Sequence, residues 1–455
     1  MIDFLKQAAQ VVPSERQKKW FDLEMYAFIH FGVNTFTGRE WGTGTEDERI
    51  FNPQKLDCDQ WVKAVKSAGC KGLVLTAKHH DGFCLWPSKY TEHSVKNSLF
   101  NGDVVKLAAE ACKRGGIKFG FYLSPWDMNS EYYGTSAYND YFCNQLTELL
   151  TEYGDIFYVW FDGACGEGED GKKQVYDFER YFSLIRKYQP NAVIFNDHGP
   201  DIRWCGNEAG QARYAEWAVV PSELCGYADV QTDKGPLCNE GDLSFLYNTD
   251  DDVGSLCNIL YSKGLVFCPS EIDMSIRKGW FWNEKDEPHS LERLFDTYLN
   301  SVGANTSLHL NVPPNKDGLI DEKDVKRLRE LGEKIEFEFG NQTVCELEKI
   351  GGTRTQPVYE IKIDCQKDIK YIILQEDLSV GQRVENFAIY HKSYSGEEFP
   401  IFQGRCIGHK KICKLNNPFM LQNPLLENVG KKSEKLVLRI KAARDEVVIN
   451  KVIVC

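Results

Sequence analysis

Apolar strands alternate with amphipathic helices over the first 200 residues of this 455-residue chain, and this alternation most constrains its fold. The predicted strands are short, apolar and rich in β-branched or aromatic residues. They are 27–32, 72–78, 118–123, 158–161 and 192–197. Helical patterns separate them at 57–68, 103–114, 137–153 and 173–188. Strands and helices spaced in this way form βα units, so the sequence predicts an α/β fold with a parallel sheet.

Polar and aromatic residues follow directly after several of these strands. The strand 158–161 runs into Asp162, and the strand 72–78 runs into His79 and His80. In a parallel α/β barrel, the C-terminal strand ends carry the catalytic groups. Asp162 follows Trp160 on the same side of the strand, a pattern typical of a sugar-processing carboxylate. The alternative interpretation is that Asp162 caps the next helix or turn.

Composition and charge exclude several classes of protein. The net charge is −13, from 67 acidic and 54 basic residues, which argues against a nucleic-acid or anionic-membrane partner. No apolar run approaches the length of a membrane span, and the first residues lack the apolar segment of a signal peptide. The 16 cysteines include no C-x-x-C pair, so we expect reduced, mostly buried thiols in a cytoplasmic protein. The sequence contains no feature that predicts an oligomeric state.

The pattern changes near residue 340. A helical stretch, 321–336, is followed by short segments of alternating polarity. These segments are 358–363, 371–374, 387–390 and 446–454. Such spacing predicts a β-sandwich. We therefore expect a catalytic (β/α)8-like barrel over residues 1–339 and a C-terminal β-sandwich over 340–455.

Several motifs, taken in order, carry a resemblance to a known family. They are 29–36 (IHFGVNTF), 40–42 (EWG), 77–83 (AKHHDGF), 122–126 (YLSPW), 160–163 (WFDG) and 310–318 (LNVPPNKDG). Together they resemble the α-L-fucosidases of glycoside hydrolase family 29, and the tail resembles the β-sandwich of that family. The resemblance implies a barrel that is often irregular in its second half. It also implies a retaining exo-α-L-fucosidase that removes terminal fucose by double displacement through a fucosyl-enzyme intermediate.

The resemblance assigns two catalytic carboxyl groups. The nucleophile corresponds to Asp162. The first candidate for the acid/base is Glu208, because segment 206–210 (GNEAG) is similar to the branch that cleaves α-1,3 and α-1,4 fucosyl linkages. The rival is Glu271, and either glutamate could instead be a structural carboxylate paired with Arg203 or Arg277. A broad linkage preference, or cleavage of α-1,2 or α-1,6 linkages, remains the alternative specificity.

Histidines and aromatic residues complete the predicted site. His30, His79 and His80 are expected to hydrogen-bond sugar hydroxyls, since an imidazole can donate and accept at once. They could instead be core residues or zinc ligands. Adjacent histidines in an extended segment point to opposite sides and rarely bind one metal together without a sharp turn. We expect no metal and no cofactor.

The remaining predicted contacts concern the hydroxyls and the methyl group of fucose. Glu40 is expected to accept hydrogen bonds from hydroxyls while Trp41 covers an apolar face of the sugar. Trp160 or Phe31 could form the apolar wall for the C6 methyl group, although a core position for Phe31 is an equal alternative. Arg203 is included among the substrate-binding residues. A metal-dependent hydrolase and a non-catalytic sugar-binding protein are the other classes compatible with such a barrel.

Overall fold

The computed structural model describes residues 2–168, 171–196, 199–222, 252–260, 262–363, 369–393, 396–415 and 435–455. Within these residues, eight parallel strands form one sheet in the order β5-β4-β3-β2-β1-β10-β9-β6. They are β1 (Met25–Ile29), β2 (Gly72–Lys78), β3 (Lys118–Leu123), β4 (Tyr158–Trp160), β5 (Val193–Phe195), β6 (Arg203–Trp204), β9 (Ser270–Ser275) and β10 (Ser307–Asn311). A parallel bridge between Phe195 and Ile202 joins the two ends of the sheet. The predicted (β/α)8-like barrel is confirmed.

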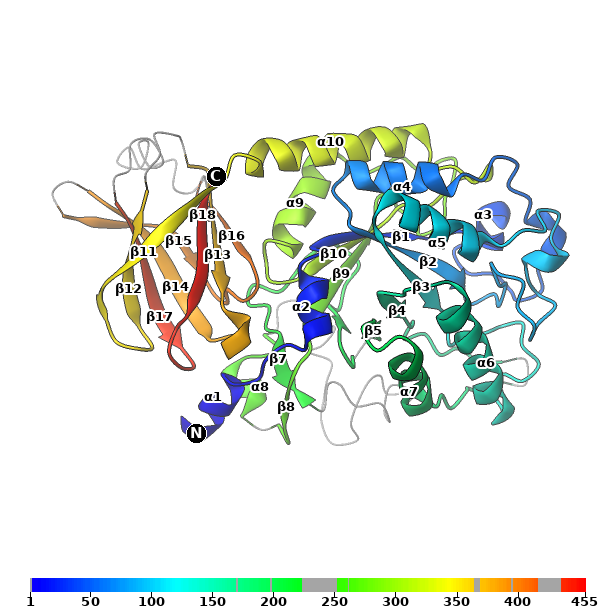
Figure 1. Ribbon diagram of the computed structural model, residues 1–455, viewed down its shortest axis with the longest axis horizontal. Helices are drawn as coiled ribbons and strands as arrows, with labels where there is room; N and C mark the ends of the chain where they lie inside the picture. The colour runs from blue at the N-terminus through cyan, green and yellow to red at the C-terminus, as the bar shows by residue number, and fades with distance from the viewer. Residues whose placement is uncertain are drawn as a thin grey trace.

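Helices cover the outside of the first half of the barrel (Figure 1). They are α4 (Cys58–Ser67), α5 (Val104–Gly115), α6 (Ala137–Glu152) and α7 (Phe178–Tyr188), with the short α3 (Val33–Thr37) after β1. Aspartates set several of their first turns: the side chains of Asp57, Asp103 and Asp177 accept hydrogen bonds from backbone N–H groups at the helix starts. The Asp177 cap explains why the fourth helix begins at 178 and not at 173 as predicted.

The second half of the barrel is irregular. The described part of the connection between β5 and β6 contains no helix. Between β6 and β9 lie the two-stranded sheet of β7 (Val219–Pro221) and β8 (Leu265–Phe267) and the short α8 (Leu256–Ile259). These three elements lie on the side of the barrel next to the C-terminal domain (Figure 1). Regular helices return with α9 (Leu291–Ser301) before β10 and α10 (Glu322–Phe339) after it.

Aromatic and polar side chains fill the barrel interior. Tyr26, Phe28, Tyr158 and Trp160 belong to one buried cluster, separate from the aliphatic core between the strands and the outer helices. Alternate residues of a strand point to opposite faces, so the same strands serve both cores. The helix α2 (Glu15–Phe21) covers the N-terminal end of the barrel with buried Trp20 and Phe21, and α1 (Ile2–Ala8) precedes it.

Ten-residue β11 (Thr343–Gly352) begins an antiparallel β-sandwich. Its first residues pair with β18 (Ile449–Val454), and its later residues pair with β12 (Pro357–Lys362). The remaining strands are β13 (Tyr371–Glu376), β14 (Val384–Lys392), β15 (Glu398–Gly404), β16 (Lys411–Lys414) and β17 (Leu436–Ala443). Their order is β15-β14-β17-β12-β11-β18-β13-β16, and a separate apolar core lies between the two layers. The predicted β-sandwich is confirmed.

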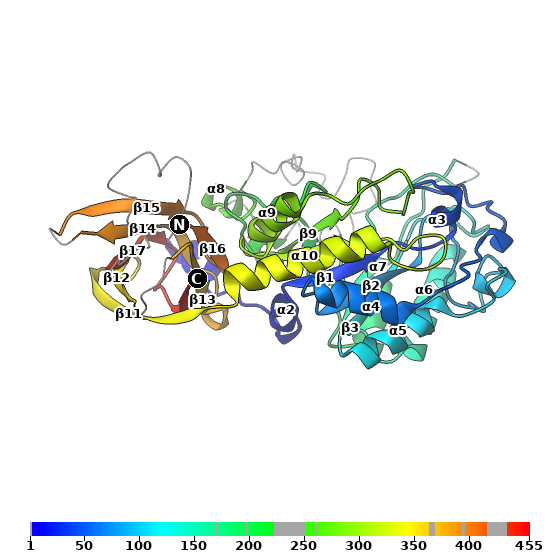
Figure 2. The same cartoon turned by 90° about the horizontal axis from the view of Figure 1, so that it is seen from above.

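The barrel and the sandwich are joined by α10 and by a backbone contact. Figures 1 and 2 show α10 running along the barrel and leading into β11. Ile412 N–H donates to the Gly303 carbonyl at 2.9 Å, and Asn305 N–H donates to the Lys410 carbonyl at 3.0 Å. The rings of Phe339 and Tyr371 lie 4.9 Å apart across the same boundary.

Candidate active site

Asp162 lies immediately after β4, at the C-terminal end of the barrel. Its Oδ1 accepts a hydrogen bond of 2.7 Å from Ala164 N–H, which fixes the turn, and its Oδ2 accepts one of 3.3 Å from the Tyr122 hydroxyl. His80 Nε2 lies 3.8 Å from the same Oδ2, and the Asp162 side chain is 25% exposed. The carboxylate therefore both caps a turn and presents one oxygen toward the barrel mouth. The two interpretations made from the sequence are compatible.

Trp160, two residues before Asp162, lies in the barrel interior. Its indole stacks on Phe195 with ring centres 4.4 Å apart and an interplanar angle of 7°. It also packs against Tyr122 and Phe28. Phe31, the other residue considered for an apolar wall, faces the outer core, where its ring packs against Phe51 and Trp61. The outward direction follows from its alternation with the inward-facing His30.

Three buried histidines stand beside Asp162. The rings of His79 and His80 are 4.2 Å apart, because the chain turns directly after β2, and His30 is 5.7 Å from His79. This turn brings together two rings that an extended segment would separate. Burial lowers the pKa of His30 to about 3 and the pKa of His79 well below its usual value. Burial also lowers the pKa of His80, although the charge of Asp162 opposes it. Neutral imidazoles at pH 7 each offer one donor and one acceptor.

Hydrogen-bond partners orient the rings of His30 and His80. His30 Nδ1 lies 2.9 Å from Asn311 Oδ1, and His80 Nδ1 lies 2.7 Å from Ser124 Oγ. Nδ1 of buried His79 has no hydrogen-bond partner among the described residues. An unpaired buried polar atom is destabilising by about 1–3 kcal/mol, so a ligand hydroxyl at His79 would recover that free energy.

Trp280 connects several predicted site residues that are distant in sequence. Its backbone N–H donates to Glu40 Oε2 at 2.8 Å, and its indole N–H donates to Glu208 Oε2 at 3.3 Å. Its ring packs against His30 at 5.1 Å. Trp41 is 59% exposed, and its ring contacts His80 and Trp126 edge-on. Trp280, Tyr122 and Trp126 were not among the predicted site residues.

Glu208 lies in the loop that follows β6. Asn207 organises this loop, because its side chain accepts from Ala209 N–H and donates to the Gln211 carbonyl. Gly210 has φ +78°, and a Cβ there would lie 2.7 Å from Met274 Sδ. Surrounding protein removes part of the hydration of Glu208 and raises the pKa of its carboxyl group, and the negative charge of Asp162 raises it further.

Glu271, the rival acid/base, is fully buried inside the barrel on β9. It accepts hydrogen bonds from Tyr26, from Tyr158 at 2.5 Å, from the Trp160 indole at 3.0 Å and from His309 at 3.2 Å. Burial alone would raise its pKa, but His309 and the hydroxyl donors hold the pKa below its usual value. These donors thus favour the ionised form of Glu271, which lies next to the Trp160 indole.

Arg203 lies on β6, and its guanidinium group is bound by other groups of the protein. It donates to Glu216 Oε1 at 2.6 Å, to the Trp217 carbonyl at 3.0 Å and to the Cys268 carbonyl at 3.1 Å, and the side chain is 1% exposed. This placement differs from the substrate contact that we predicted, because the guanidinium group is buried among these partners. Neither Arg203 nor Arg277 pairs with a candidate acid/base, since Arg277 pairs with Asp324.

Asp273 is a further carboxyl group next to the site, and sequence analysis did not select it. It lies two residues after Glu271 on β9 and accepts a 2.8 Å hydrogen bond from the indole of Trp204. Burial, together with the charges of Glu271 and Glu208, raises the pKa of Asp273 well above its usual value. This environment therefore favours the neutral form of Asp273.

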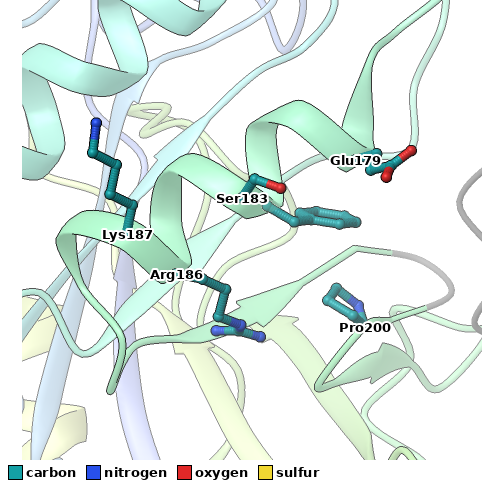
Figure 3. A pocket seen from close by; sticks show the side chains of 6 residues that line it. Glu179, Ser183, Arg186, Lys187 and Pro200 are labelled. Carbon is teal, nitrogen blue, oxygen red and sulfur yellow. The ribbon is translucent and has the colours of Figure 1, made fainter.

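A hollow on the outer surface of the barrel offers no comparable chemistry. It has a volume of about 490 Å³ and lies between α7 and the segment at Pro200 (Figure 3). Of the described residues that line it, only Glu179 carries a carboxyl group. Arg186 is occupied by Asp201 and by the Ala192 carbonyl.

The described residues contain no group of three or more histidine, cysteine, aspartate or glutamate side chains placed to hold a metal ion. In the same part of the chain, the cysteines are free thiols. None of the described helices combines the length and the apolar character needed to cross a bilayer.

A parallel barrel with a carboxylate at a strand end, buried histidines and the exposed indole of Trp41 is the arrangement expected of a glycoside hydrolase. Comparison with known proteins agrees: the α-L-fucosidase family profile matches residues 4–338. The chain therefore belongs to the α-L-fucosidase family, glycoside hydrolase family 29.

Three relatives illustrate the similarity. Alpha-L-fucosidase 1 of Arabidopsis thaliana is 39% identical over 439 residues, which are 89% of this chain and 82% of the plant protein. A Bacteroides ovatus protein assigned as an α-L-fucosidase has a crystal structure that superposes with a TM-score of 0.87 at 41% identity, covering 99% of this chain and 75% of that one. A Ruminococcus gnavus family 29 fucosidase in complex with fucose gives a TM-score of 0.79 at 27% identity, covering 98% and 95%.

Extensive treatment with EDTA is expected to leave the hydrolytic activity unchanged. The described residues form no group of ligands for a metal ion, and His30 and His80 each have a ring nitrogen within hydrogen-bond distance of a neutral side chain. The measurement is the rate of aryl fucoside hydrolysis before and after chelation, together with the zinc content of the protein. Activity lost on chelation and restored by a divalent ion would favour the metal-dependent hydrolase.

Proposed function

We propose that the chain is a retaining exo-α-L-fucosidase in which Asp162 is the nucleophile and Glu208 the acid/base. One observation carries this proposal: Trp280 places Glu208 next to the histidines of the Asp162 site, because its indole N–H donates to Glu208 Oε2 at 3.3 Å and its ring packs against His30. A retaining mechanism requires such a pair, with one ionised and one protonated carboxyl group about 5 Å apart. The solved fucosidase with bound fucose supports the choice of sugar.

In the first step, Asp162 Oδ2 attacks the anomeric carbon of fucose while Glu208 protonates the departing glycosidic oxygen. In the second step, Glu208 removes a proton from water, which hydrolyses the fucosyl ester. The Tyr122 hydroxyl and the Ala164 N–H hold the Asp162 carboxylate in place during both steps. The indole N–H of Trp280 orients Glu208. This arrangement needs no metal and no cofactor.

Glu271 has the wrong environment for an acid/base. Four donors from three strands surround its carboxylate, and its side chain is fully buried. A general acid must reach the glycosidic oxygen and carry a proton, whereas these donors favour the ionised form. We propose that Glu271 supports Trp160, which carries the apolar floor of the fucose site.

The binding residues divide between hydroxyl groups and apolar faces of the sugar. His30, His79 and His80 are proposed to bind hydroxyls, together with Glu40. Trp41 covers one apolar face from the solvent side, since 59% of its surface is exposed. We propose for Arg203 a supporting position behind the Glu208 loop, since its guanidinium group is fully occupied there.

The proposed substrates are α-1,3- and α-1,4-fucosylated oligosaccharides. L-Fucose is expected to be released from Lewis-type trisaccharides much faster than from α-1,2-linked 2′-fucosyllactose. The basis is the segment 206–210, whose sequence is similar to that of the α-1,3/1,4 branch and whose loop presents Glu208. Chromatography of the released sugar measures the linkage preference, and proton NMR of the first-formed fucose measures retention.

The matched control for this comparison is 4-nitrophenyl fucoside, which tests the fucose site without a sugar aglycone. Rapid cleavage of 2′-fucosyllactose with no cleavage of Lewis trisaccharides would contradict the linkage assignment and leave the family unchanged. An inverted first product would contradict the double displacement.

We further propose that residues 1–339 form the catalytic domain and residues 340–455 the C-terminal domain. The end of α10 at Phe339 and the family match over residues 4–338 support this division. The free thiols support a reducing compartment, and we propose the cytoplasm.

A further inference from the structure

We propose that Arg444, in the C-terminal sandwich, is a positioning residue for Glu208 and acts through Trp217 and Glu216. The inference rests on the proposed role of Glu208 as the acid/base. It gives the sandwich a part in catalysis, although the sandwich contributes none of the proposed site residues.

The Glu216 carboxylate holds both ends of the loop that carries Glu208. On the N-terminal side, Arg203 donates to Glu216 Oε1 at 2.6 Å. On the C-terminal side, the backbone N–H of Arg213 donates to Glu216 Oε2 at 3.0 Å, and its guanidinium group lies 3.7 Å from the same oxygen. Burial alone would raise the pKa of Glu216, but Arg203 and Arg213 keep it below its usual value. The loop is therefore closed by a buried ionised clasp, Arg203–Glu216–Arg213.

Trp217, the residue after Glu216, is held in place by Arg444 of the sandwich. The Arg444 guanidinium carbon lies 3.5 Å from the centre of the Trp217 ring, and the two side chains are almost completely buried. Arg444 also donates to Glu385 Oε1 at 2.6 Å and to the carbonyl of Gly254. A Cβ at Gly254 would lie 2.1 Å from Trp217 Cβ, so this position admits only glycine beside the indole.

Two more side chains, Gln382 and Asn305, connect the same segment to the sandwich by hydrogen bonds. The Gln382 side chain accepts from Ala218 N–H at 2.9 Å. Asn305 donates to the Glu216 carbonyl at 2.9 Å and accepts from His409 N–H at 2.6 Å. Because Arg203 also donates to the Trp217 carbonyl, the clasp and the clamped indole form one rigid unit. The position of the sandwich therefore determines where the two ends of the loop that carries Glu208 lie.

Loss of this support should affect acid catalysis more than nucleophilic attack. Among the described residues, Asp162 is held by Tyr122 and by the turn after β4, outside the clasp, whereas Glu208 depends on its loop. A displacement of about 1 Å in a reacting group can lower a rate by roughly 100-fold. Such a displacement matters most when the leaving group needs a proton.

The test compares Arg444→Ala with the wild-type enzyme on aryl α-L-fucosides whose phenols span a wide range of acidity. For phenyl fucoside, a poor leaving group, kcat/KM is expected to fall about 10- to 100-fold, whereas for dinitrophenyl fucoside it should fall less than about 3-fold. In a Glu208→Ala background, Arg444→Ala should change kcat/KM less than about 3-fold for every substrate, because two changes in one unit are not additive.

Arg439→Ala is the matched control. Arg439 also stacks on an aromatic ring, with its guanidinium carbon 5.6 Å from the centre of Tyr390, and it pairs with Glu398 at 2.6 Å. All of these partners lie within the sandwich, so its removal should leave the leaving-group dependence unchanged. If Arg444→Ala does not fold, Arg444→Lys replaces it, because lysine keeps the charge beside Glu385 but cannot stack a planar group on Trp217.

The outcomes separate the two proposals. A uniform loss across leaving groups, or an equal loss in the Glu208→Ala background, would overturn the positioning role of Arg444. If Glu208→Ala itself shows no leaving-group dependence, the acid/base assignment fails. If the rate of Glu208→Ala depends steeply on the leaving group and the rates of Arg444→Ala and Arg444→Lys do not, Glu208 remains the acid/base and Arg444 does not position it.

Discussion

Asp162→Asn is expected to lower kcat by several orders of magnitude with every fucoside, including those with excellent leaving groups. An amide cannot form the glycosyl ester through which double displacement proceeds. The side chain should keep its place, because its Oδ1 can still accept from Ala164 N–H and the amide group can replace the contact with the Tyr122 hydroxyl. Steady-state kinetics with an activated aryl fucoside measures the loss, and fucose binding by calorimetry tests whether the site remains intact.

Azide provides the control for this variant. Asp162→Asn should not be rescued by azide, since the amide fills the space in which azide would attack. Asp162→Gly or Asp162→Ala should be rescued, because the smaller side chain leaves that space open. Near-normal turnover by Asp162→Asn would show that another residue is the nucleophile.

Glu208→Ala is expected to lower the rate of hydrolysis of a natural disaccharide by a large factor. For an activated aryl fucoside, the rate of the first step should fall only slightly. A sugar alkoxide must be protonated as it departs, and nitrophenolate need not be; general acid catalysis contributes about 100- to 10,000-fold. With the aryl substrate, deglycosylation should become limiting, and azide should accelerate it by attacking the intermediate. The measurement is kcat and kcat/KM for both substrates, with and without azide.

The pH profile supplies an independent test of Glu208. Burial and the charge of Asp162 raise the pKa of its carboxyl group, so the protonated form persists to higher pH than for an ordinary glutamate. Wild-type kcat/KM for the disaccharide should fall as pH rises through this pKa. That alkaline limb should be absent in Glu208→Ala. If Glu271→Ala, and not Glu208→Ala, shows the leaving-group dependence and the azide rescue, the two glutamates exchange roles.

Sequence patterns predicted the first half of the barrel because its strands end in chemically distinctive residues. The strand before Asp162 and the strand before His79 and His80 were visible as apolar runs, and the helices between them began at aspartate caps. The strands and helices of the second half could not be predicted from the periodicity of the sequence. β6 has only two residues, and no helix in the described connection separates it from β5.

The contacts of the site were harder to predict than its position. Glu208 was chosen through the resemblance to a family and not through any spacing. The difference between Glu208 and Glu271 depends on donors that come from several strands, including Tyr26 and His309. Trp280 follows β9 without a periodic pattern, and it reaches Glu40 across 240 positions of sequence. Only the closure of the barrel brings such residues together.

The sandwich shows a similar limit. Strands β12, β13, β14 and β18 were predicted, at least in part, from alternating polarity. β11 was not, since most of its residues are exposed and it pairs with two layers. The buried Arg444 had no signal in sequence, because its partner Trp217 belongs to the barrel. Charged residues are rarely fully buried unless they are paired, so sequence alone favoured a surface position for Arg444.

The low pKa of His30 has a consequence for acidic surroundings. Burial lowers this pKa to about 3, so His30 stays uncharged in a moderately acidic medium, and burial lowers the pKa values of His79 and His80 as well. In the proposed site, His30 would therefore offer the sugar the same donor and acceptor in neutral and in moderately acidic surroundings. Acid would then act on the enzyme first through carboxyl groups such as Glu208, whose pKa is raised, and not through a charged His30.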